Sequence, residues 1–169
     1  MTRRLPVPAV LLALAACAGT DAYRPLEAGD PAPVYAATEL DGDTVALATL
    51  RGHAVLLNIW ATWCAPCREE MPELQALHER FADRGLRVLG VSIDASGSED
   101  PIRYFLDDFG VSFTVLHDPA ETVSQKFRTR GVPETFLIDT HGRIAHRWIG
   151  RFEPLSDDAV RRVEDALRR

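Results

Sequence analysis

Two cysteines three residues apart, Cys64 and Cys67, are the residues in this sequence best suited to chemistry. They lie in the segment WATWCAPCREEMP, residues 60–72. Residues i and i+3 of a helix have Cβ atoms about 5–6 Å apart, close to the separation that a disulfide needs. The pair could therefore exchange electrons as a reversible disulfide, bind a metal ion or brace the fold.

The expected position of the pair favours electron exchange. The apolar run AVLLNIW (54–60) is typical of a strand buried on both faces, and a helix is predicted from about 65 to 84. Cys64 would then face the unpaired N–H groups and the positive dipole end of that helix, which favour a thiolate. Cys67, one turn further on, could resolve a mixed disulfide formed at Cys64.

The two other uses of the pair find less support. Structural zinc takes four ligands, usually from two such pairs or from a pair and two histidines. The histidines show no ligand-like pairing, so we predict no metal site; they are His53, His78, His117, His141 and His146. A structural bridge across two residues would constrain the unfolded chain little.

Apolar runs and turn signals alternate along the rest of the chain, which predicts one α/β domain over 29–169 with a mixed sheet covered on both faces. The expected elements are a hairpin around Asp41-Gly42, strands over 86–93 and 113–116, helices from about Asp100, Asp118 and Leu155, and a second hairpin that joins 135–139 to 144–149.

The N-terminus reads as an export signal. Two arginines precede a short apolar run, and the segment LAAC (14–17) resembles the lipobox of bacterial lipoproteins. We therefore predict a lipoprotein signal peptide over 1–16, lipidation of Cys17, and a lipidated N-terminus with a flexible tether over 17–28. The alternative is an incidental cysteine in a signal that is cleaved elsewhere. Export would place the Cys64 and Cys67 thiols in an oxidising compartment.

The charge balance excludes one class of partner. The 169 residues carry 19 Lys and Arg against 25 Asp and Glu, a net charge of −6, and no block of basic residues is present. We therefore expect no nucleic-acid partner.

Three motifs together resemble the thioredoxin superfamily. The pair appears as WCAPC at a predicted helix start, Pro72 lies five residues after the second cysteine, and GVPETFLID (131–139) places a proline before a strand. The stretch LLNIWATWCAPCREEMPEL resembles the membrane-anchored TlpA/ResA-like group much more closely than it resembles cytosolic thioredoxins. The resemblance covers about residues 29 to 168.

The resemblance implies a thioredoxin-like fold with an N-terminal β-hairpin extension and a central αβ insertion at about 94–117. It also implies a cis peptide bond between Val132 and Pro133. In that arrangement the backbone of Val132 can pair with an extended substrate beside Cys64. Trp63 and Pro66 would shape the site.

Two positions bear on the proton that the resolving thiol must lose. Thioredoxins carry a buried aspartate six residues before the first cysteine, where this chain has Asn58. An amide cannot accept a proton, so water or another group must do so. Glu70 matches a glutamate that lines the active-site pocket of ResA-like proteins. Its alternative is a solvated glutamate in the first turn, favoured by the helix dipole.

The resemblance implies a lipid-anchored thiol–disulfide oxidoreductase facing the periplasm or the extracytoplasmic side of a bacterial membrane. The group usually acts reductively, with a membrane-embedded thiol donor of electrons. Its targets are disulfides of exported proteins, such as apocytochrome c or copper-site proteins. No diffusible cofactor is required.

Other functions stay open at this point. A copper-binding delivery module could hold Cu(I) with the same two cysteines. A peroxiredoxin-like peroxidase is a second alternative, although Ala61 occupies the threonine position of its Pro-x-x-x-Thr-x-x-Cys signature. A redox-inactive docking domain is a third.

Overall fold

The computed structural model describes residues 24–169, which form a seven-stranded sheet with helices on both faces. The strands are ordered β2-β1-β5-β4-β3-β6-β7. β3, β4 and β5 run parallel, and the other neighbours are antiparallel. The strands are β1 (Ala36–Glu39), β2 (Thr44–Ala46), β3 (Ala54–Trp60), β4 (Leu86–Ser92), β5 (Thr114–His117), β6 (Glu134–Ile138) and β7 (Ile144–Ile149). The predicted mixed sheet is confirmed.

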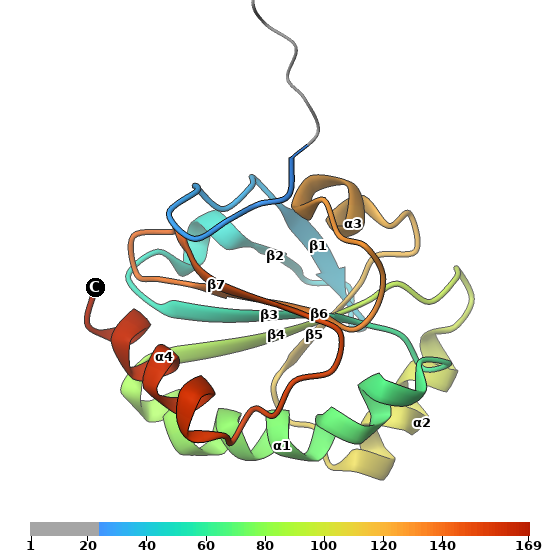
Figure 1. The fold of residues 1–169 in the computed structure, drawn as a ribbon. Coiled ribbons are helices and arrows are strands. Elements are labelled where there is room, and N and C mark those ends of the chain that lie inside the picture. The colour runs from blue at the N-terminus through green and yellow to red at the C-terminus, as the bar shows by residue number, and fades with distance from the viewer. Residues whose placement is uncertain (1–23) are drawn as a thin grey trace, which may run out of the picture.

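Four α-helices cover the sheet unequally. They are α1 (Ala65–Phe81), α2 (Glu99–Phe109), α3 (Thr122–Phe127) and α4 (Asp157–Leu167), and the 3₁₀ turns are η1 (Leu47–Leu50) and η2 (Ala82–Arg84). Figure 1 shows α1, α2 and α4 on one face, with α3 and the N-terminal segment on the other. The fold is therefore the three-layer arrangement expected of a thioredoxin-like protein.

Two hydrophobic cores follow from these layers. All seven residues of β3 are buried, because this central strand contacts helices on one face and the N-terminal segment and α3 on the other. Trp60, Cys64 and Cys67 belong to the core under α1, α2 and α4. Phe127 and Phe136 belong to the opposite core. The cysteine pair is thus set on the edge of a packed core.

Both additions to the basic fold are present. β1 and β2 form the predicted hairpin, with Ala36 opposite Ala46. Its turn contains Gly42 at a φ of 99°, a conformation that favours glycine. The predicted insertion supplies α2 and β5, and β5 lies between β1 and β4 in the sheet. The insertion therefore joins the hairpin to the central strands.

The predicted starts of three helices are wrong by one to four residues. α2 begins at Glu99 rather than Asp100, and α3 begins after Glu121, which has a left-handed φ of 53°. α4 is capped by Ser156, whose hydroxyl accepts from the Ala159 N–H, while Leu155 lies outside the helix and is 40% exposed. Apolar spacing located these helices, but local polar contacts decide where each begins.

The folded domain begins earlier than residue 29. Arg24 donates to Asp30 from both terminal guanidinium nitrogens, at 2.8 and 2.7 Å. The Gly29 N–H donates to the Ile144 carbonyl at 2.8 Å. Residues 24–28, predicted as part of the tether, therefore lie against the domain. The predicted signal peptide and Cys17 lie outside the described residues.

Gly90 in β4 allows two buried aromatic rings to pack closely against this strand. A Cβ atom there would lie 3.0 Å from Trp60 Nε1 and 3.1 Å from Phe113 Cε2, and both rings are buried. We expect Gly90→Ala to destabilise the protein by about 1–3 kcal/mol, because two packed rings must shift. Urea unfolding followed by tryptophan fluorescence checks this, and an unchanged midpoint would contradict it.

Candidate active site

The two cysteines form a disulfide at the start of α1. The sulfurs are 2.04 Å apart and the Cα atoms 5.3 Å apart. Cys64 is the N-cap residue of α1, and its sulfur accepts a hydrogen bond from the Cys67 N–H at 3.3 Å. Cys64 retains 5% exposure and Cys67 none. Cys64 is therefore the more exposed residue of the pair.

Residues beside the disulfide form an open surface. Trp63 is 68% exposed, and Ala65 and Pro66 are exposed as well. A disulfide that lies next to an exposed tryptophan and an exposed proline can be approached by another protein chain.

The proline of GVPETFLID lies at the same end of the sheet. The Val132–Pro133 peptide bond is cis, as the resemblance implied. β6 pairs antiparallel with β3 so that Glu134 lies opposite Ile59. Pro133 therefore precedes β6 where β3 runs toward the cysteines.

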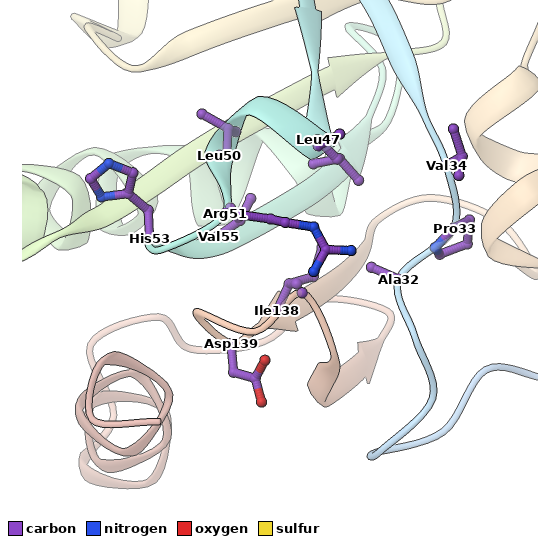
Figure 2. Close-up of a pocket in the computed structure, with 12 residues that line it drawn as sticks. Ala32, Pro33, Val34, Leu47, Leu50, Arg51, His53, Val55, Ile138 and Asp139 are labelled. Carbon is purple, nitrogen blue, oxygen red and sulfur yellow. The ribbon is translucent and has the colours of Figure 1, made fainter.

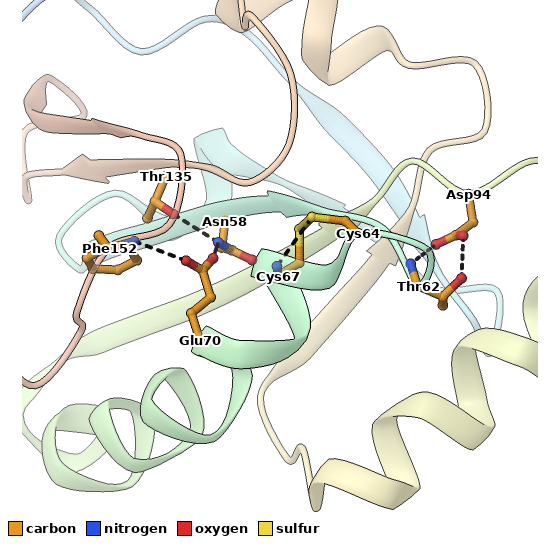
Figure 3. Close-up of a disulfide and its surroundings, with 8 residues drawn as sticks. All are labelled: Asn58, Thr62, Cys64, Cys67, Glu70, Asp94, Thr135 and Phe152. Carbon is orange, nitrogen blue, oxygen red and sulfur yellow. Dashed lines mark hydrogen bonds between the residues drawn. A yellow bond between two sulfur atoms is a disulfide. The ribbon is translucent and has the colours of Figure 1, made fainter.

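Glu70 is buried, so its interpretation as a solvated first-turn residue is wrong. Its side chain is 1% exposed. Its Oε1 accepts from Asn58 Nδ2 at 2.7 Å and its Oε2 from the Phe152 N–H at 3.2 Å, as Figure 3 shows. Asn58 also donates to Thr135 Oγ1 at 2.9 Å. The residue that replaces the thioredoxin aspartate thus holds the Glu70 carboxyl in place.

Burial raises the pKa of Glu70 from 4.5 to about 7. Hydrogen bonds from Asn58 and the Phe152 N–H, together with the charge of Arg151, oppose this rise without cancelling it. A carboxyl with a pKa near neutrality can take up or release a proton at physiological pH. Glu70 is one helical turn beyond Cys67 on α1.

Asp94 is a site residue that the sequence analysis missed. Asp94 is 3% exposed, and its carboxylate accepts from the Thr62 N–H at 3.0 Å and the Thr62 hydroxyl at 2.7 Å (Figure 3). It also accepts from the Ser92 hydroxyl at 2.8 Å. It therefore fixes the segment that leads into Cys64. The sequence does contain one signal for Asp94, because it lies just after β4. Ser92 at the end of β4 lies opposite Trp60 at the end of the parallel strand β3, so residues just after the two strands lie close together.

A separate pocket lies at the other end of β3. Figure 2 shows Arg51 reaching between the N-terminal segment around Ala32 and the end of β6 around Ile138. Arg51 Nη1 donates to the His141 carbonyl at 3.0 Å. Val55, near the start of β3, lines this pocket, whereas the disulfide follows the strand's far end. None of the predicted site residues lines it, so the pocket is separate from the disulfide.

Residues 24–169 contain neither a membrane-spanning helix nor a cluster of metal-ligating side chains. No helix there is long and apolar enough to cross a membrane. No group of three or more His, Cys, Asp or Glu side chains in that range is arranged to hold a metal ion.

Comparisons with known proteins place the chain in a family. The AhpC/TSA family matches residues 28–147. The thiol-disulfide oxidoreductase ResA of Bacillus thuringiensis (strain Al Hakam) is 29% identical over 148 residues, which cover 83% of this chain and 84% of the relative.

Two solved structures have the same fold. A thiol:disulfide interchange protein of the thioredoxin family from Chlorobium tepidum TLS has a TM-score of 0.70 and 27% identity, covering 86% of this chain and 98% of that one. A secreted thiol-disulfide isomerase from Corynebacterium glutamicum has a TM-score of 0.72 and 27% identity, covering 81% and 85%.

These relatives carry thiol–disulfide chemistry on the fold found here, and this chain holds a cysteine pair at the start of α1. The chain therefore belongs to the AhpC/TSA family and is a thiol–disulfide oxidoreductase of the TlpA/ResA-like type within the thioredoxin superfamily.

Proposed function

We propose that this protein is a lipid-anchored, extracytoplasmic enzyme that reduces disulfides of exported proteins. The observation that carries the proposal is a slightly exposed Cys64 together with a buried Glu70 carboxyl whose pKa is about 7. Cys64 supplies the nucleophile, and Glu70 supplies a group that can accept the proton of Cys67.

The reduced enzyme acts in two steps. The Cys64 thiolate attacks one sulfur of the substrate disulfide, forming a mixed disulfide and expelling the other substrate sulfur as a thiolate. Cys67 then loses its proton and attacks the Cys64 sulfur. The bond between Cys64 and the substrate breaks, the substrate leaves with both sulfurs reduced and takes up protons from solvent, and the enzyme keeps the Cys64–Cys67 disulfide. Two electrons pass from enzyme to substrate, and a membrane thiol donor restores the enzyme.

Glu70 takes the proton of Cys67 in the second step. Asn58 has no basic group, but it holds the Glu70 carboxyl through a 2.7 Å hydrogen bond. The raised pKa matches this role, because a base with a pKa near the working pH is the most efficient.

Substrate binding uses the cis-proline segment and the exposed rim. Pro133 has no N–H to compete for, so the backbone of Val132 pairs with an extended substrate segment. Trp63, which is 68% exposed, and Pro66 contact the substrate beside the target sulfur.

The location and targets rest on the N-terminus. LAAC at 14–17 favours lipidation of Cys17 and retention at the membrane. One structural relative is described as secreted, which supports an extracytoplasmic site.

Exported proteins that need free thiols, such as apocytochrome c before haem attachment, are the proposed targets. Cys17→Ala should move the protein from the membrane fraction to the soluble fraction.

The reduction potential of the Cys64–Cys67 pair, measured in glutathione buffers, tests the direction of transfer. We expect a reduction potential of about −250 mV or below, which suits a reductant, whereas a potential of about −120 mV would make the protein an oxidant. Peroxide consumption without another thiol protein would favour the peroxidase alternative. Stoichiometric binding of Cu(I) by the reduced protein would favour the copper module.

A further inference from the structure

A buried ion pair lies directly beside the cis-proline segment. Glu134 follows Pro133 and is fully buried, and Arg147 on the neighbouring β7 is 8% exposed. The Arg147 Nε–H donates to Glu134 Oε1, and the guanidinium lies 5.2 Å from the centre of the Phe136 ring. The mechanism proposed above uses neither charge. Charges so buried are retained in proteins only when paired and hydrogen-bonded, so their remaining contacts are informative.

Those contacts go to the backbone of the loop that precedes Pro133. The Arg130 N–H donates to Glu134 Oε2 at 2.9 Å. Arg147 Nη2 donates to the Arg128 carbonyl at 3.2 Å. The ion pair therefore holds the loop at two points, one on each side of residue 129. The loop lies between α3 and β6 and leads to Val132 and Pro133.

The N-terminal segment adds a second set of contacts from outside. Arg147 Nη1 reaches the Leu26 carbonyl at 3.4 Å, and Arg128 Nη1 donates to the Arg24 carbonyl at 2.8 Å. Arg24 in turn binds Asp30. The hydrogen bond from Arg24, followed by that from the Glu27 N–H, lowers the pKa of Asp30 to about 2, so this outer clasp is charged at neutral pH.

We infer that the Glu134–Arg147 pair is a positioning element that holds residues 128–133 in the conformation that binds substrate, and that the segment 24–30 supports it from outside. The inference rests on the proposed role of Val132 and Pro133 in substrate binding. It adds that their geometry is set by two side chains that never touch the reacting sulfurs.

Arg147→Lys is the central test, because lysine keeps the charge for Glu134 but lacks the planar fork that reaches Arg128 and Leu26. A loosened loop must be ordered when substrate binds, and ordering the backbone of one residue corresponds to about a tenfold loss of affinity. We expect KM for insulin to rise about tenfold with kcat changed less than twofold. Turnover of hydroxyethyl disulfide, which is too small to span the loop, should be unchanged.

The matched control is Arg84→Lys, the same change in a surface pair with Glu164 at 3.3 Å. Glu164 belongs to α4, which covers the face of the sheet opposite α3 (Figure 1). It should leave both substrates unaffected. Hydrogen exchange of the Arg130 amide gives a second readout, because that N–H should exchange faster in Arg147→Lys. Equal losses on insulin and hydroxyethyl disulfide, or an unchanged KM for insulin, would overturn the inference.

Arg24→Ala and Asp30→Ala test the outer clasp and do not disturb the core. We expect KM for insulin to rise about two- to threefold in each, with hydroxyethyl disulfide turnover unchanged. An unchanged KM in both would overturn the part assigned to segment 24–30. The wild type separates the two proposals: inactivity toward every disulfide would sink the proposed function, whereas an active wild type with unaffected variants would sink only this inference.

Discussion

Replacing Cys64 by serine should abolish disulfide reduction, with a loss of more than about 10³-fold in insulin turnover. A serine hydroxyl at the start of α1 is not ionised at neutral pH, so the nucleophile disappears while the helix keeps an N-cap residue. Cys64 is the residue of the pair that keeps some exposure, at 5%, so Cys67, which has none, cannot take its place.

Cys67→Ser separates the roles of the two sulfurs. The first attack by Cys64 should still occur, but no thiol remains to resolve the mixed disulfide, which should accumulate. Mass spectrometry of the variant after incubation with an oxidised substrate would detect a covalent adduct removed by dithiothreitol. An adduct in Cys64→Ser instead of Cys67→Ser would reverse the assignment. Turnover above a few per cent in Cys64→Ser would contradict the mechanism altogether.

These roles could be predicted from the sequence because local geometry dictates them. A pair at i and i+3 on a helix that follows a buried strand has little freedom, and the structure places Cys64 and Cys67 at the N-terminus of α1. The proline of GVPETFLID likewise precedes the strand that pairs with β3. The two β-hairpins follow from a turn signal between two extended runs. In each case the signal lies within a few neighbouring residues.

The residues that support the site were harder to predict because their partners are far away in the chain. Glu70 is removed from solvent by Asn58 and by the Phe152 backbone, 82 residues on, so helical spacing alone left its burial undecided. The contact between Asp94 and Thr62 exists only because β4 pairs with β3 in the folded sheet, so the sequence alone did not indicate it. Arg147 gave no signal at all, since an arginine on a predicted strand is usually an exposed one.

The same long-range burial makes Glu70→Gln the most informative change after the cysteines. The pKa of Glu70 is about 7 in the folded protein, above its ordinary value of 4.5. The folded state therefore binds this proton more tightly than the unfolded state. Its contribution to stability is complete below about pH 4.5 and is lost as pH rises through 7, by roughly 3 kcal/mol in total.

Glutamine cannot titrate, so the stability of the Glu70→Gln variant should not show this dependence on pH. We expect the free energy of unfolding of the oxidised wild type to fall by about 3 kcal/mol relative to Glu70→Gln between pH 4 and pH 8. Urea unfolding across that range measures the difference. Glu69→Gln is the matched control, because Glu69 lies next to Glu70 on α1 but is exposed and pairs with Arg151 at the surface. The free energy of unfolding of Glu69→Gln should change with pH as that of the wild type does.

The rate of disulfide reduction should also depend on the protonation of Glu70. If Glu70 accepts the proton of Cys67, Glu70→Gln should slow the release of reduced substrate about 10²-fold. The inflection near pH 7 in the wild-type pH–rate profile should disappear with it. Formation of the mixed disulfide at Cys64 should keep its rate, because that step needs no proton from Cys67. A variant that keeps the inflection, or slows both steps equally, would mean that the buried carboxyl shapes the site without moving the proton.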